Sequence, residues 1–212
     1  MSAELLGKAF ASTASVLDAM PPDTLDDPTP CASWDVRALI DHIVGTTEFC
    51  ATTAETGLAP TPQAHDYASG DFREAFRAGA AHAVAAFSEK GVMDRAMRLP
   101  FADLPGGVYV SIAALDTFVH GWDLAKATGQ STDLDPGVAE SLLAFARAAV
   151  PDTARGPDGI AAFGPPVELA EVSCPADELA AELRRRGVQF AQGYFVARPA
   201  PIESLSALSS RR

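Results

Sequence analysis

The 212-residue chain is 48% hydrophobic and 21% charged, and its formal net charge is -12. This length and composition predict a globular core, and the acidic balance argues against nucleic acid and anionic membranes as partners, because both attract clustered Lys and Arg. The three cysteines form no CxxC motif, the N-terminus lacks the basic-then-apolar order of a signal peptide, and no apolar run has membrane-spanning length. We therefore expect a cytoplasmic protein without disulfides.

Hydrophobic periodicity predicts a chain that is mostly helical. Apolar residues recur every three or four positions in six stretches, separated by segments rich in Pro, Gly and Asp. The predicted helices cover residues 3–20, 34–53, 71–90, 108–129, 136–150 and 177–186. Ser33 and Asp135 are expected to cap the second and fifth helices, and Gly91 is expected to end the third. Residues 97–109 are expected to form a hairpin or an ordered loop. The sequence thus predicts an all-α bundle of four long helices with additions.

The stretch 108–129, VYVSIAALDTFVHGWDLAKATG, is apolar on nearly every side of its predicted helix. A helix that is hydrophobic all round is normally buried in the middle of a bundle. It nevertheless carries Asp116, His120 and Asp123, whose i, i+4 and i+7 spacing places them on one ridge. No Lys or Arg precedes Lys126 in this stretch, and a buried carboxylate needs a paired cation or a metal. The sequence therefore predicts that another part of the fold meets this ridge.

A divalent metal ion is the candidate partner, with His42 from the second predicted helix completing the ligands. His42 lies beside the apolar stripe of that helix, so its side chain can turn inward. Asp116 and His120 can reach one ion from a single helix, and two imidazoles with one carboxylate leave an open position, as in catalytic zinc sites. The alternative is a plain Asp–His pair without metal, because this spacing also arises by chance.

The other histidines and cysteines belong to no recognisable motif. His82 is expected to be packed or at the surface, His65 lies in a predicted loop, and Cys31 and Cys50 are expected to be ordinary buried thiols. The chain has no G-x-S-x-G elbow, phosphate-binding loop or GxGxxG fingerprint.

Two segments resemble the signature regions of a metal-binding actinobacterial family. They are TPCASWDVRALIDHIVG at residues 29–45 and LDTFVHGWDLAKATGQ at residues 115–130. This family is similar to the N-terminal domain of mycothiol-dependent maleylpyruvate isomerase, within the DinB/YfiT-like superfamily. The likeness covers about residues 3–150 and extends loosely to FGPPVEL at residues 163–169. It implies a four-helix bundle that holds zinc or another divalent ion.

Carried over by position, the ligands that the resemblance implies are His42, Asp116 and His120. Asp116 stands where the isomerase has Glu, so its side chain is one methylene shorter. Asp123 follows the ligand pair as an Asp does in the family, and we expect it to orient a ligand or a bound water from outside the coordination sphere. The family's enzymes bind a low-molecular-weight thiol as thiolate, since a divalent cation lowers the pKa of a coordinated thiol. The resemblance therefore implies a mycothiol-type S-transferase or isomerase with a small electrophile as second substrate.

Two features depart from the isomerase. The chain is too short to include the isomerase's second, sterol-carrier-like domain. In addition, residues 183–205, LRRRGVQFAQGYFVARPAPIESL, locally resemble the end of EAL-type cyclic-dinucleotide phosphodiesterase domains, although the EAL tripeptide and the acidic metal site of that barrel are missing. We therefore expect a metal-binding bundle over residues 1–170 and an appendage of uncertain origin over residues 171–212.

Three functions are compatible with the sequence. In the first, a metal-activated thiol attacks a small electrophile. In the second, the ion is structural or sensory, and the bundle stores a ligand or forms a homodimer; a closed shell that included Asp123 would favour this version. In the third, the polar ridge is a hydrogen-bonded cluster that holds no metal.

Overall fold

The computed structural model describes residues 2–31, 34–61, 63–100, 102–149 and 173–185. Its helices and strands are α1 (Ala3–Asp18), α2 (Val36–Thr56), the 3-10 turn η1 (Tyr67–Ser69), α3 (Phe72–Ser88), the 3-10 turn η2 (Val92–Asp94), β1 (Ala96–Arg98), β2 (Asp103–Pro105), α4 (Gly106–Ala127), α5 (Pro136–Ala149) and α6 (Pro175–Arg185). Helices dominate, so the prediction of an all-α fold is confirmed. Within the described ranges, every helix is too short or too polar to cross a lipid bilayer.

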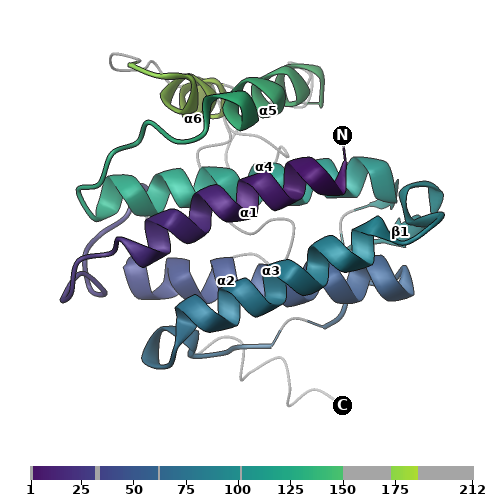
Figure 1. Ribbon diagram of the computed structural model, residues 1–212, viewed down its shortest axis with the longest axis horizontal. Coiled ribbons are helices and arrows are strands. Elements are labelled where there is room, and N and C mark those ends of the chain that lie inside the picture. The colour runs from purple at the N-terminus through teal and green to yellow at the C-terminus, as the bar shows by residue number, and fades with distance from the viewer. Residues whose placement is uncertain (1, 32–33, 62, 101, 150–172, 186–212) are drawn as a thin grey trace.

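Four long helices form the bundle. Helix α1 packs against α4 and α3, and α2 packs against α3 and α4, so each helix has two neighbours around a shared core. In Figure 1, α1 and α4 lie side by side above α2 and α3, while α5 and α6 lie on the far side of α4. Because α4 is covered by the bundle on one side and by α5 and α6 on the other, it is the helix with least access to water. Its all-round hydrophobicity predicts this placement.

Two close contacts between helices depend on glycine. A Cβ atom added to Gly121 of α4 would lie 2.5 Å from Oγ1 of Thr13 in α1, and one added to Gly79 of α3 would overlap Oγ1 of Thr47 in α2. The Thr13 hydroxyl in turn donates a hydrogen bond to the carbonyl of Thr117, 3.0 Å away. The backbones of α1 and α4 therefore approach closely at Gly121, the residue after His120.

The helix ends show which local signals the chain uses. Helix α2 begins two residues later than expected, because the carboxylate of Asp35 is its N-cap and accepts a hydrogen bond from Ala38 N at 2.8 Å. The expectation that Ser33 caps this helix was wrong. Asp135 does cap α5, accepting from Val138 N at 3.0 Å. Gly91 has a left-handed φ of 85°, yet α3 has already ended at Ser88, so this glycine opens η2 instead.

The expected hairpin is present in the short strands β1 and β2. They pair antiparallel with Ala96 opposite Pro105 and Arg98 opposite Asp103. The buried Met97 side chain anchors the hairpin on the bundle. Helix α4 begins at Gly106, so residues 106 and 107, which were expected in the hairpin or loop, belong to the helix instead.

Helices α5 and α6 form a pair that covers α4. The indole nitrogen of Trp122 in α4 donates to Asp177 of α6 at 2.9 Å, and Arg147 of α5 pairs with Glu178 of α6 at 3.0 Å. The expected short charged helix near residues 177–186 is therefore α6. The proposed boundary after residue 170 and nearly all of the EAL-like stretch lie outside the described residues, and both stay predictions.

Candidate metal centre

Helix α4 carries three polar residues into the interior of the protein. His120 is fully buried, and Asp116 and Asp123 are each 5% exposed. Their spacing places them on consecutive turns of one helix face, as the sequence predicts. Carboxylates at such depth are stable only with cationic or proton-donating partners. The arrangement of those partners determines what the ridge can bind.

Helix α2 places His42 opposite this ridge. Apolar side chains on either side of the histidine anchor α2 in the core, namely Leu39, Ile40, Ile43 and Val44. His42 itself lies at the edge of that stripe and turns toward α4, so its Nε2 is 3.4 Å from Oδ2 of Asp116. The hydroxyl of Thr46, one turn further along α2, lies at the same distance from this nitrogen. His42 has thus turned inward to face the acidic ridge.

The potential ligand atoms of His42, Asp116 and His120 lie within 4.8 Å of one another. Asp116 directs Oδ2 toward His42 and Oδ1 toward Nε2 of His120, which is 3.7 Å away. Within the described part of the chain, neither Asp116 Oδ1 nor His120 Nε2 has a hydrogen-bond partner, although both atoms are buried. Leaving such atoms without a partner is costly, and a cation between them would satisfy both. The three side chains therefore fit a divalent metal ion.

The protonation tendencies of these groups fit the same arrangement. Burial lowers the pKa of His42 despite its contact with Asp116, so this imidazole is a neutral potential ligand at neutral pH. Burial alone would raise the pKa of Asp116, but the positive charge of His120 and the hydrogen bond from His42 outweigh it, and the pKa is lowered. Burial likewise opposes protonation of His120, yet Asp116 and Asp123 hold its pKa well above the ordinary value. The ridge thus attracts positive charge, which a proton or a metal ion can supply.

The indole of Trp34 covers the two histidines. Its ring centroid lies 4.7 Å from that of His42 and 5.7 Å from that of His120. The two imidazoles meet edge to face, with centroids 4.8 Å apart. Trp34 therefore forms an apolar wall on one side of the candidate site and limits the contact of both rings with water.

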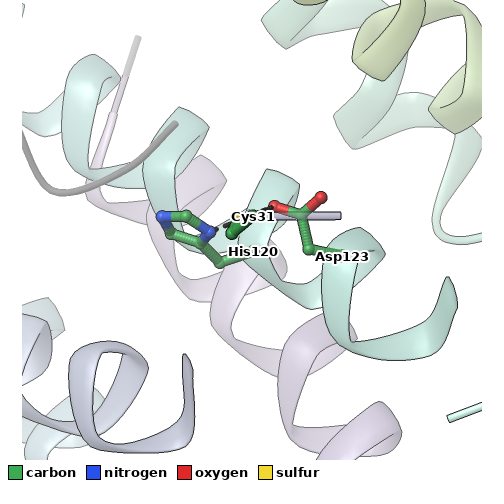
Figure 2. Close-up of side chains that lie close together, drawn as sticks. All are labelled: Cys31, His120 and Asp123. Atoms are coloured by element: carbon green, nitrogen blue, oxygen red, sulfur yellow. Dashed lines mark hydrogen bonds and ion pairs between the residues drawn. The ribbon is translucent and has the colours of Figure 1, made fainter. Parts of the chain in front are cut away.

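Cys31, like Trp34, lies near the site although the sequence analysis did not place it there. Its buried thiol lies 3.4 Å from Oδ2 of Asp123, and the same oxygen lies 3.2 Å from Nδ1 of His120. Figure 2 shows these three side chains together, with His120 and Asp123 on one helix. Burial raises the pKa of the Cys31 thiol, so it stays protonated at neutral pH and can donate to the carboxylate. The sequence offered one indication of such a contact: Asp123 lies on a helix that was expected to be buried, and a buried carboxylate needs a proton donor.

The other histidines and cysteines are not part of the site. His82 is exposed on α3 and pairs with Glu55 at 2.8 Å, as expected of a surface histidine. His65 stacks on Tyr67, with ring centroids 5.0 Å apart. Cys50 is buried beside the hydroxyl of Tyr109, and burial raises its pKa to about 12. These groups therefore have other partners in the structure.

Comparison with known proteins identifies the family. The mycothiol maleylpyruvate isomerase N-terminal domain matches residues 6–125, more than half of the chain and all but the ends of the four-helix bundle. The chain belongs to this family. It is also 38% identical over 178 residues to the uncharacterized proteins MT0763 and Rv0738 of two Mycobacterium tuberculosis strains, CDC 1551 / Oshkosh and ATCC 25618 / H37Rv. Each match covers 84% of this chain and 94% of the relative. No solved structure matches the chain.

The residues of the candidate site lie within the family match. The matched residues include His42, Asp116, His120 and the supporting Cys31 and Asp123. Helices α5 and α6 lie beyond the match. Asp177 of α6 nevertheless accepts a hydrogen bond from Trp122 of α4, the residue next to Asp123. The family therefore connects the bundle with metal and mycothiol chemistry, while the roles of individual residues stay predictions.

Proposed function

We propose that this protein holds a divalent cation, zinc by preference, through His42, Asp116 and His120, and uses it to activate a low-molecular-weight thiol of the mycothiol type toward a small electrophile. The observation that carries the proposal is the pair of buried atoms, Asp116 Oδ1 and His120 Nε2, which face each other without a hydrogen-bond partner among the described residues. Two imidazoles and a carboxylate form a donor set suited to zinc and similar borderline metals.

The proposed ligand set contains three protein side chains, so a substrate thiol would take the fourth position. Asp123 faces Nδ1 of His120, on the opposite edge of the ring from the nitrogen that faces Asp116, so it is not placed to act as a fourth ligand. Three protein ligands with an open position are typical of catalytic zinc sites rather than structural ones. When bound, the cation would lower the pKa of a coordinated thiol so that it ligates as thiolate at neutral pH.

The exposed fractions of the three proposed ligands favour one side for the approach of a thiol. The side chain of His42 is 9% exposed, compared with 4% for Asp116 and 0% for His120. A thiol would therefore approach along the His42 side, where Trp34 forms the apolar wall. The indole would shield the reacting sulfur from water, which favours a charged nucleophile with little hydration.

The same low exposure supports a second candidate function. A site so deeply buried also suits a non-catalytic module, in which the ion stabilises the fold or reports on metal supply. The two functions differ in one property: only the catalytic site accepts a thiol as an additional ligand. A cluster without any metal is the third alternative, and metal analysis separates it from both.

The decisive experiment is metal analysis followed by thiol titration. Protein purified without a His-tag is assayed for bound metal, then loaded with Co²⁺ and titrated with mycothiol while its optical spectrum is recorded. We expect one equivalent of metal and an intense thiolate-to-cobalt charge-transfer band that appears only with mycothiol. His42→Ala and Asp116→Ala should abolish both signals, and His82→Ala, a surface histidine, is the matched control. Metal without the band would support the non-catalytic module, and no metal would leave only the hydrogen-bonded cluster.

A further inference from the structure

Asp123 joins two side chains from different parts of the fold at a single carboxylate oxygen. Its Oδ2 lies 3.2 Å from Nδ1 of His120, one turn away on α4, and 3.4 Å from the sulfur of Cys31. Cys31 precedes α2 and is 92 positions away from Asp123 along the chain. Figure 2 shows the three groups side by side, and all three are at least nine-tenths buried. Water therefore competes little for these contacts.

The two nitrogens of His120 have different partners. Nδ1 faces Asp123, and Nε2 faces Asp116. A hydrogen bond from Nδ1–H to a carboxylate fixes the ring orientation and leaves the lone pair of Nε2 available to a metal. How firmly His120 is held therefore depends on how firmly Asp123 is held.

The loop before α2 holds Cys31 in a defined position. Its backbone N–H donates to Oγ1 of Thr29 at 3.0 Å, and its carbonyl accepts from the backbone N–H of Trp34 at 2.8 Å. The same loop places Trp34 over His42 and His120. One short segment thus supports the candidate site from two sides, with an indole over the rings and a thiol against Asp123.

We propose that Cys31 is a positioning residue for the metal site: its thiol, through Asp123, holds His120 in the orientation and tautomer that ligate. This inference rests on the proposed function, because Cys31 would support the binding of the same cation by His120. It differs from the expectation for Cys31 as an ordinary buried thiol, since the contact to Asp123 gives the sulfur a specific polar partner.

A second metal site is the competing arrangement for these residues. The potential ligand atoms of Cys31, His120 and Asp123 also lie within 4.8 Å of one another. However, these atoms are already hydrogen-bonded to each other through Asp123 Oδ2, whereas Asp116 Oδ1 and His120 Nε2 face each other at 3.7 Å without a hydrogen-bond partner among the described residues. The contacts of the first set are complete without a cation, whereas a cation would satisfy the two unbonded atoms of the second set, so the observations favour support over ligation.

The test compares Cys31→Ala with Cys31→Ser, which keeps a hydroxyl donor. Zn²⁺ and Co²⁺ affinities are measured by competition with a chromophoric chelator, and the ring N–H resonance of His120 is followed by NMR in protein stripped of metal. For Cys31→Ala we expect affinity to fall about tenfold, in line with the effect of outer hydrogen-bond partners on metal sites. The His120 ring proton should exchange faster with water. Cys31→Ser should restore both properties, and Cys50→Ala, which removes a buried thiol elsewhere, should change neither.

Two results would overturn the proposal. One is a Cys31→Ala variant with unchanged affinity and unchanged exchange of the His120 proton. The other is a second equivalent of Co²⁺ with a sulfur-to-cobalt band in the absence of any added thiol, lost in Cys31→Ala, because Cys31 would then be a ligand. If the wild-type protein bound no cation at all, the proposed function would fail, and the exchange of the ring proton alone would decide the role of Cys31.

Discussion

The indole of Trp34 lies against the imidazole of His42, with ring centroids 4.7 Å apart and the planes inclined by 37°. Trp34 comes from the loop before α2 and His42 from the second turn of that helix, so the contact folds the loop back over the helix. His42 in turn contacts Asp116 of α4. The indole therefore reports on the state of a proposed metal ligand without being a ligand itself.

Zinc binding should change the fluorescence of Trp34. An imidazole that coordinates a cation becomes more electron-poor and quenches a stacked indole more strongly. The chain has two tryptophans, and Trp122 lies on the far side of α4 beside Asp177, so a Trp122→Phe background isolates Trp34. We expect zinc to lower the remaining emission in a saturable titration. His42→Ala should remove the effect, and an equal response in that variant would show that the cation binds elsewhere.

Removing the charge of Asp116 should abolish metal binding while changing little in shape. Asp116→Asn keeps the size of a side chain that is fully packed between α2 and α4, but it removes the anionic ligand. We expect cation affinity to fall by at least about a hundredfold, which is more than the loss of a residue that only hydrogen-bonds to a metal ligand produces. Isothermal titration with zinc provides the measurement.

Asp116→Glu is the matched comparison for that variant. It restores the residue that the isomerase carries at this position, but the extra methylene must fit a packed interior, which costs about 1–3 kcal/mol. We expect Asp116→Glu to unfold more easily than wild type in denaturant and still to bind zinc. Loss of binding in Asp116→Glu as complete as in Asp116→Asn would mean that geometry, not charge, limits the site.

The stability of protein stripped of metal should fall as pH rises above 6.5. Asp116 and Asp123 hold the pKa of His120 well above its ordinary value of 6.5, so its contribution to stability is fully present below 6.5 and is lost as pH rises through the folded-state pKa. The pKa values of His42 and Asp116 are lowered, so above pH 6.5 His42 is neutral and Asp116 is ionised in both the folded and the unfolded protein. Neither group therefore changes stability in this pH range. Denaturant unfolding between pH 6 and pH 9 tests the sign.

The affinity for zinc should have the opposite pH dependence to the stability of the metal-stripped protein. His120 must release a proton to ligate, so zinc affinity should rise over the same pH range in which the metal-stripped protein loses stability. The pKa of His82 is also raised, by Glu55 and Glu48, so His82→Gln is the necessary control. Because His82 is 42% exposed, its own effect should be small. A pH profile that flattens in His82→Gln would contradict the role assigned to His120.

The close contact between α1 and α4 predicts a steric effect at Gly121. A Cβ atom there would lie 2.5 Å from Oγ1 of Thr13 and 3.4 Å from its Cα, so Gly121→Ala should cost about 1–3 kcal/mol of unfolding free energy. The double variant with Thr13→Ala should recover most of the loss. Gly107→Ala, whose Cβ would meet only ordinary contacts in the first turn of α4, should be neutral or stabilising. Equal destabilisation of both glycine variants would exclude a clash as the cause.

The cysteines should differ sharply in reactivity. Cys31 and Cys50 are buried, and burial raises the pKa of Cys50 to about 12, so neither thiol should react in the folded protein. Cys174 is the most exposed of the three. We expect iodoacetamide at pH 8 to label one cysteine in the native state, which Cys174→Ser should remove, and all three in denaturant. Rapid native labelling of Cys31 would show that its contact with Asp123 opens frequently.

Much of the helical framework could be predicted from local sequence alone. The 3.6-residue period of apolar side chains depends only on near neighbours, so α4 and the ridge of Asp116, His120 and Asp123 could be recognised before any contact was known. The errors lie at helix ends. Asp35, not Ser33, is the N-cap of α2, and α4 begins at Gly106, two residues before the predicted start.

The sequence by itself determined a buried helix with two carboxylates, and therefore the need for positive charge or proton donors around it. Only the tertiary structure decided which groups meet that need. The His42–Asp116 contact spans 74 positions and the Cys31–Asp123 contact spans 92, so both depend on how whole helices pack, including the glycine contact between α1 and α4. Local periodicity places a side chain on a face, but the nitrogen or oxygen that it presents to a partner is set by helix crossing and side-chain packing.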